Sequence, residues 1–169
     1  MPKSDAIRPT QDRVREALFS MLQCEMPGAV FLDLFAGTGA VGLEALSRGA
    51  TRATFVEMNA KHLETLRKNI EAFGKASVSD VVRGDAYRYI SSYRGDGFDI
   101  AFADPPYALG EERGYESVLQ TLAERGVVKP GGLFVAEMTA VQRTGDLPGW
   151  EMLRDRTYGK TRICLWRRI

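Results

Sequence analysis

The sequence of 169 residues has only two cysteines, Cys24 and Cys164, and they lie far apart. Two isolated cysteines exclude a disulfide framework and a cysteine-ligated metal site, and we expect both thiols to be reduced and buried. No apolar run is long enough to cross a bilayer, and the first five residues lack the apolar core of a signal peptide. We therefore expect a cytoplasmic protein with no metal and no membrane partner.

A strong excess of charge is absent as well, because 23 Lys and Arg residues nearly balance 22 Asp and Glu residues. This balance excludes a general basic coat for nucleic acid, although a local basic face would still bind phosphates. Ordinary solvated arginines are the competing interpretation, and charge alone does not separate the two. The basic residues gather near the two ends of the chain, at Arg8, Arg13, Arg15, Arg154, Arg156, Lys160, Arg162, Arg167 and Arg168.

Internal repeats, linkers and low-complexity tracts are also missing. With 44% apolar and 27% charged residues, the composition is typical of a globular protein rather than a disordered one. A chain of this length suits a single domain with one sizeable core. We therefore expect one domain over residues 1–169, in which residues 1–24 form an N-terminal arm and a helix at 11–22 capped by Thr10.

Alternating apolar patterns and glycine or proline breaks predict the secondary structure. Strands are expected at 30–35, 53–56, 78–82, 98–103, 133–138, 150–158 and 161–168. Helices are expected at 11–22, 40–48, 60–73, 86–93 and 115–124. This order indicates an α/β fold with a mostly parallel seven-stranded sheet, helices on both faces and a C-terminal antiparallel hairpin.

Asp104, Pro105, Pro106 and Tyr107 directly follow the apolar strand expected at 98–103. Proline fixes φ and removes a ladder donor, so these residues form a stiff loop at the carboxyl end of that strand. In open α/β sheets, ligands bind at this edge. The loop presents a carboxylate, backbone carbonyls and an aromatic ring, which together can hold a flat, amine-bearing base. The alternative is a rigid turn without chemical function.

A glycine-rich segment joins the first expected strand to the next helix. Gly37 and Gly39 let a ligand approach the backbone closely, and the helix N-terminus behind them offers free N–H groups. Glu57 follows Gly37 by 20 residues, the spacing of the acid that binds a ribose hydroxyl in dinucleotide sites. NAD and S-adenosylmethionine both contain this ribose, so the motif alone fits either ligand. A glycine turn without a ligand is the third interpretation.

Two features favour S-adenosylmethionine. Asp33 lies directly before the glycine segment, where a carboxylate disfavours a pyrophosphate and favours a cationic amine. The sequence shows no hydride-transfer apparatus, whereas the loop at Asp104 is suited to positioning an amine. Asp85 follows the third expected strand, where it either accepts a hydrogen bond from the adenine amine or caps the helix that begins at Ala86.

Three segments together carry a resemblance to a known family. Arg8-Pro9-Thr10 with residues 12–19, the segment 31–39 and the loop 104–107 resemble the bacterial RsmD-type family of Rossmann-like, class I S-adenosylmethionine-dependent methyltransferases. The glycine motif is common to many methyltransferases, but the Arg-Pro-Thr helix paired with it is far more specific. The resemblance runs in order from Arg8 to the turn at 158–161, which is nearly the whole chain.

The resemblance implies an enzyme that methylates the exocyclic N2 amine of a guanine in small-subunit ribosomal RNA, either free or in an assembling subunit, most simply as a monomer. Asp104 and the Pro105 carbonyl would accept the amine hydrogens while Tyr107 stacks on the base. The catalytic set is then Asp104, Pro105, Pro106 and Tyr107. The S-adenosylmethionine-binding set is Thr10, Asp33, Phe35, Gly37, Gly39, Glu57, Asp85 and Ala86.

Other functions compete with this one. Loops of the Asp-Pro-Pro-Tyr kind also serve adenine amines in DNA, although no target-recognition domain is attached here. A donor-binding or RNA-binding module without catalysis is disfavoured by the intact Asp104 and Tyr107. A nicotinamide-dependent oxidoreductase would share the glycine motif, and a binding assay with both cofactors distinguishes it.

Overall fold

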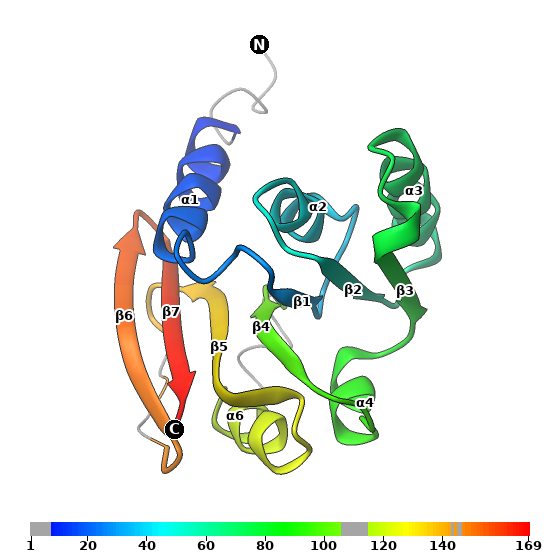
Figure 1. The fold of residues 1–169 in the computed structure, drawn as a ribbon. Coiled ribbons are helices and arrows are strands. Elements are labelled where there is room, and N and C mark those ends of the chain that lie inside the picture. The colour runs from blue at the N-terminus through cyan, green and yellow to red at the C-terminus, as the bar shows by residue number, and fades with distance from the viewer. Residues whose placement is uncertain (1–7, 106–114, 143, 145–146) are drawn as a thin grey trace.

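The computed structural model describes residues 8–105, 115–142, 144 and 147–169, with residues 8–10 described by their backbone only (Figure 1). The strands are β1 (Val30–Asp33), β2 (Arg52–Glu57), β3 (Ser79–Arg83), β4 (Phe98–Ala103), β5 (Val128–Thr139), β6 (Trp150–Tyr158) and β7 (Thr161–Arg168). The helices are α1 (Arg8–Met21), α2 (Ala40–Ser47), α3 (Ala60–Ala72), the 3₁₀ turn η1 (Ala76–Val78), α4 (Ala86–Ser91) and α6 (Tyr115–Glu124).

These strands form one seven-stranded sheet in the order β3-β2-β1-β4-β5-β7-β6. The pairs among β1 to β5 are parallel, and β7 pairs antiparallel with both β5 and β6. The strand order reverses between β1 and β4, whose carboxyl ends lie side by side. Such a reversal opens a crevice at the carboxyl edge of the sheet. The predicted fold class is confirmed.

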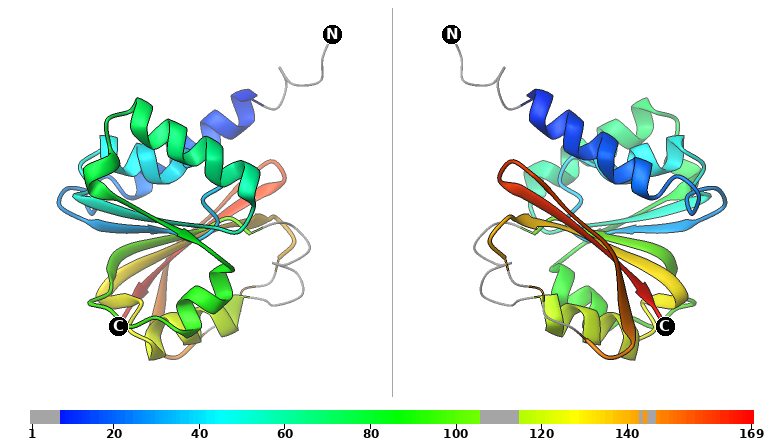
Figure 2. Two further views of the ribbon diagram at one scale, coloured as in Figure 1. Left: turned by 90° about the vertical axis from the view of Figure 1, so that its right-hand side faces the viewer. Right: turned by 90° about the vertical axis from the view of Figure 1, so that its left-hand side faces the viewer.

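Two core clusters fill the space between the sheet and its helices. One cluster packs α1, α2 and α3 against the sheet, with Leu18, Leu66 and Phe31 among its buried members. The other packs α4 and α6 against the opposite face, with Ile90 and Leu119 buried there. Figure 2 shows the sheet nearly edge-on between these two helix layers. Because the central strands β1 and β4 are covered on both faces, they are apolar and buried at nearly every position.

The structure corrects several sequence predictions, and strand β5 begins at Val128 rather than at residue 133. Helix α1 begins at Arg8, so Thr10 lies in its first turn and is not the residue before it; a proline such as Pro9 is tolerated there because its missing N–H is not needed. Strand β1 ends at Asp33 rather than at residue 35. The Ala36 N–H in the following turn donates a hydrogen bond to the Val56 carbonyl of β2. Cys24 is exposed, since it lies in the turn that follows α1.

Cys164 is buried as expected. Among the described residues, no helix combines the length and the hydropathy of a membrane-spanning segment.

Candidate active site

Four acidic residues lie at the carboxyl ends of four neighbouring parallel strands. Asp33 ends β1 and Glu57 ends β2, while Asp85 and Asp104 follow β3 and β4 by one or two residues. A backbone hydrogen bond of 3.1 Å from the Gly84 N–H to the Glu57 carbonyl ties two of these strand ends together. The fold therefore gathers predicted site residues from distant parts of the sequence at one edge of the sheet.

The glycine segment makes a tight turn between β1 and α2. Gly37 and Gly39 have φ values of 56° and 91°, in the left-handed region that favours glycine. A Cβ atom at Gly39 would lie only 2.4 Å from the Leu66 side chain, whereas one at Gly37 would meet nothing within 4 Å. The backbone is thus packed against α3 at Gly39 and open at Gly37, where a ligand can approach.

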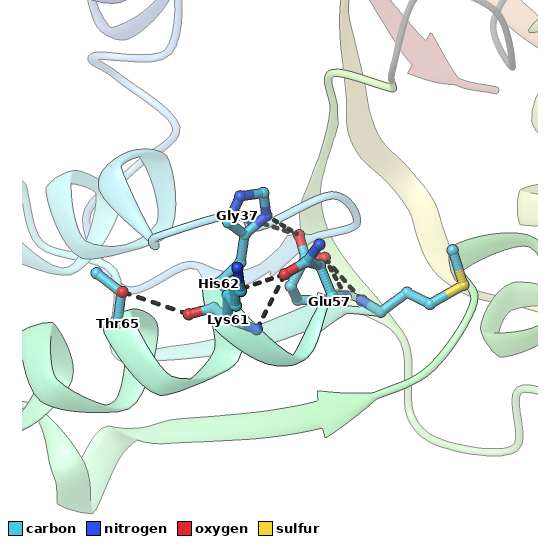
Figure 3. A network of polar contacts seen from close by, with 7 residues as sticks. Gly37, Glu57, Lys61, His62 and Thr65 are labelled. Atoms are coloured by element: carbon cyan, nitrogen blue, oxygen red, sulfur yellow. Dashed lines mark hydrogen bonds and ion pairs between the residues drawn. The ribbon is translucent and has the colours of Figure 1, made fainter.

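Glu57 holds this turn in place. One carboxylate oxygen accepts a hydrogen bond of 2.8 Å from the Gly37 N–H, and the other accepts bonds of 2.8 Å from the N–H groups of Met58 and Asn59 (Figure 3). His62 Nδ1 lies 3.9 Å from the first oxygen. Glu57 therefore connects the two loops after β1 and β2. An ionised carboxylate has about four lone-pair sites, so three donors leave capacity for a further hydroxyl group.

Asp33 is buried, with a relative exposure of 1%. One of its carboxylate oxygens accepts a hydrogen bond of 3.2 Å from the Gly42 N–H of α2. The other oxygen is buried and has no hydrogen-bond partner among the described residues. Burial raises the pKa of Asp33 from 3.8 to about 7, and the nearby Asp104 and Glu57 add to this rise. A buried, unpartnered acceptor of this kind suits a positively charged ligand group.

Asp85 caps α4, since its side chain accepts a hydrogen bond of 2.9 Å from the Arg88 N–H. The helix-cap interpretation is therefore confirmed, and it leaves the second carboxylate oxygen available. Ala86 is buried at the start of α4. Phe35 packs edge-on against Tyr87 with ring centroids 5.9 Å apart. Phe35 and α4 thus form one apolar wall near the ends of β1 and β3.

A cavity of about 400 Å³ lies at the ends of β4 and β5, beneath α1. Asp104 and Pro105 line it, as do the first residues of α2. The cavity is lined by Gln11, Val14, Arg15, Leu18, Ala40, Val41, Phe102, Asp104, Pro105, Glu137, Met138, Thr139, Gln142 and Thr161. Pro106 and Tyr107 lie outside the described residues, and the side chain of Thr10 does as well.

Sequence reasoning missed Glu137, which lies on β5 and lines the same cavity as Asp104. The Asp104 and Glu137 side chains form a hydrogen bond, and burial together with that bond raises the pKa of Glu137. Asp104 is exposed and Glu137 is half-buried, and desolvation of the Asp104 carboxyl group raises its pKa as well. The available signal was an acid at the end of an otherwise apolar run, residues 133–138.

Comparisons with known proteins agree with this geometry. The profile of a protein family described as "Conserved hypothetical protein 95" matches residues 1–167. Ribosomal RNA small subunit methyltransferase D of Escherichia coli is 35% identical over 169 residues, covering 99% of this chain and 83% of that protein.

Solved structures share the fold over most of their length. A conserved hypothetical protein from Streptococcus pyogenes superimposes with a TM-score of 0.83 at 28% identity, covering 92% of this chain and 95% of that one. An RNA methyltransferase from Salinibacter ruber, solved with S-adenosyl-L-homocysteine, has a TM-score of 0.69 at 16% identity, covering 99% and 92% of the two chains.

Proposed function

The chain belongs to the RsmD-type family of ribosomal RNA methyltransferases, and from this premise we propose that it methylates the exocyclic N2 amine of a guanine in small-subunit ribosomal RNA. The methyl donor is S-adenosylmethionine, and the whole chain acts as one methyltransferase domain. The protein works as a monomer in the cytoplasm, on RNA that is free or within an assembling subunit. The observation that carries the proposal is the position of Asp104 and Pro105 on a cavity beside the glycine turn.

The residues at the strand ends suit the chemical groups of S-adenosylmethionine. The unpartnered oxygen of Asp33 would accept from the positively charged amino group, and the open backbone at Gly37 leaves room beside it. Glu57 has capacity for a ribose hydroxyl, and the wall formed by Phe35, Ala86 and Tyr87 would contact the adenine. When bound, S-adenosylmethionine supplies a methyl group activated by its sulfonium charge.

The chain's own contribution is to hold the acceptor base. A guanine amine is a weak nucleophile because its lone pair is delocalised into the ring. Asp104 and the Pro105 carbonyl can each accept one amine hydrogen, which favours a pyramidal nitrogen with a localised lone pair. The cavity of about 400 Å³ is within the usual size range of a small-molecule site. The base must be unpaired to enter it.

Replacing Asp104 tests this proposal. We expect Asp104→Ala to lower the rate of methyl transfer to small-subunit RNA by at least about 100-fold, because one acceptor for the amine hydrogens is lost. Affinity for S-adenosylmethionine, measured by calorimetry, should change little. Nucleoside mass spectrometry of the RNA identifies the product as N2-methylguanosine or as an adenine derivative.

Asp96→Ala provides the matched control, since Asp96 is exposed in the loop before the same strand. This variant should retain full activity. Unchanged turnover in Asp104→Ala would remove Asp104 from the mechanism, and a methylated adenine would replace guanine as the target base.

A further inference from the structure

Asp104 and Glu137 lie on neighbouring strands at the same height in the sheet. The parallel register pairs Ala103 of β4 with Ala136 of β5, so the next residue on each strand is Asp104 or Glu137. Opposite Glu137 on β7 is Ile163, a fully buried core residue. Side chains alternate across a strand, which turns both acids toward the layer that contains α1 and α2.

The two carboxyl groups belong to the wall of one cavity. Their side chains are close enough to share a hydrogen bond, which requires a proton on one of them. Two adjacent carboxylates cannot both ionise without a large electrostatic cost. Desolvation raises the pKa of both acids; their hydrogen bond and the Asp104 charge raise the pKa of Glu137 further, whereas the bond opposes the rise at Asp104, so we assign the proton to Glu137.

The groups around the pair reinforce this arrangement. Asp33 on β1 lies within electrostatic reach of the pair, because the Asp104 charge contributes to the raised pKa of Asp33. The Tyr115 hydroxyl from α6 donates a 3.0 Å hydrogen bond to the backbone carbonyl of Glu137 and so holds β5 at this position. Arg15 of α1 also lines the cavity, but its guanidinium donates to the Asp12 carboxylate at 3.2 Å.

We propose that Glu137 is a positioning residue for the acceptor amine, acting through Asp104. Its carboxyl group donates to one oxygen of Asp104, fixes the rotation of that carboxylate, and leaves the other oxygen to accept from the base. This role rests on the proposed function, because the amine is the group that Asp104 holds there. It extends the site by one residue, from the end of β4 to β5.

The test compares two substitutions of Glu137 with different hydrogen-bonding capacity. Glu137→Ala removes the donor, so the pKa of Asp104, followed by ¹³C NMR of its carboxyl carbon, should rise above the wild-type value. Its rate of methyl transfer should fall by about 10- to 100-fold, with unchanged affinity for S-adenosylmethionine. Glu137→Gln keeps an N–H donor and should restore both the Asp104 pKa and most of the activity.

Asp104→Asn assigns the NMR signal, and Glu151→Gln, at an exposed position on β6, is the matched control. If Glu137→Ala does not fold, Glu137→Leu fills its volume and takes its place. An Asp104 pKa that is the same with and without the Glu137 carboxyl group would overturn the proposal. So would a Glu137→Gln variant as inactive as Glu137→Ala. A wild-type protein that methylates no RNA refutes the proposed function alone, because the NMR titration still reports on the pair.

Discussion

Asp33 shows how burial alone can prepare a single residue for a charged ligand. The side chain is held by one bond from the Gly42 N–H, and its second oxygen has no partner among the described residues. In the unliganded protein the carboxylate is therefore poorly stabilised, and its pKa rises to about 7. A cationic amine at this position would supply the missing partner. The ligand thus gains affinity from a group that weakens the empty fold.

Replacing this residue should change how stability depends on pH. The pKa of Asp33 is raised from 3.8 to about 7 on folding, so the folded state retains a proton that the unfolded state releases. Wild-type stability should accordingly fall as the pH rises from about 4 through about 7. Asp33→Asn has no charge to bury, and at pH 8 it should exceed the wild type by up to about 4 kcal/mol.

Urea unfolding at a series of pH values measures this difference. Asp96→Asn, an exposed change, should follow the wild-type curve. Parallel curves for the wild type and Asp33→Asn would contradict the prediction.

Among the elements, the packing of α2 against the sheet depends on a glycine in its first turn. Gly42 faces β2, and a Cβ atom there would lie 2.3 Å from Cε1 of Phe55. Phe55 is fully buried in the core that joins β2 to the helix layer, so its ring has little space to move. Gly42 therefore allows close helix–sheet packing, and its N–H also donates a hydrogen bond to Asp33.

Gly42→Ala should consequently destabilise the protein by about 1–3 kcal/mol, although alanine is the better helix former. Overpacking against Phe55 is the cause. Gly84→Ala is the control, because a Cβ at Gly84 would meet nothing within 4 Å. The free energy of unfolding in urea should be unchanged or slightly raised by that control. A Gly42→Ala variant as stable as the wild type would show that Phe55 can shift at little cost.

At the scale of the whole molecule, the small net charge of +1 conceals an uneven distribution. Arg154 and Arg156 are exposed on the edge strand β6 and donate to backbone carbonyls of their neighbours. Arg162 and Arg167, by contrast, are held by Asp155 and Glu25. The β6–β7 register places Arg154 and Arg156 opposite Leu165 and Ile163. Both therefore lie on the face of the sheet that carries α1 and the cavity.

This arrangement predicts that the β6 arginines contact RNA phosphates. Arg154→Gln and Arg156→Gln should each weaken RNA binding and reduce the slope of log K against log salt by about 0.7–1. Arg67→Gln removes the same charge from an exposed position on α3, near the opposite edge of the sheet, and should leave the slope unchanged. Fluorescence anisotropy at several salt concentrations measures the effect. Equal slopes for all three variants would exclude β6 from the RNA-binding surface.

The sequence by itself determined most of the elements. The bounds of β4, α6 and the β6–β7 hairpin agree residue for residue with the prediction, because apolar periodicity and glycine or proline breaks are local properties of the chain. Asn59 caps α3 by a similarly local interaction, since its side chain accepts hydrogen bonds from the N–H groups of Lys61 and His62. The acidic residues at the carboxyl ends of β1 to β4 could also be recognised, since the carboxyl ends of parallel strands meet at one edge.

Only the tertiary structure decided what those residues face. The pairing of Glu137 with Asp104 depends on the register between β4 and β5, which joins segments far apart in the sequence. The unpartnered oxygen of Asp33 and the contact of Gly42 with Phe55 depend on how closely α2 packs against the sheet. Dehydration and close contact are properties of the assembled core. For this reason a local pattern predicts which residues reach the site, but not which of them share a proton or lose their water.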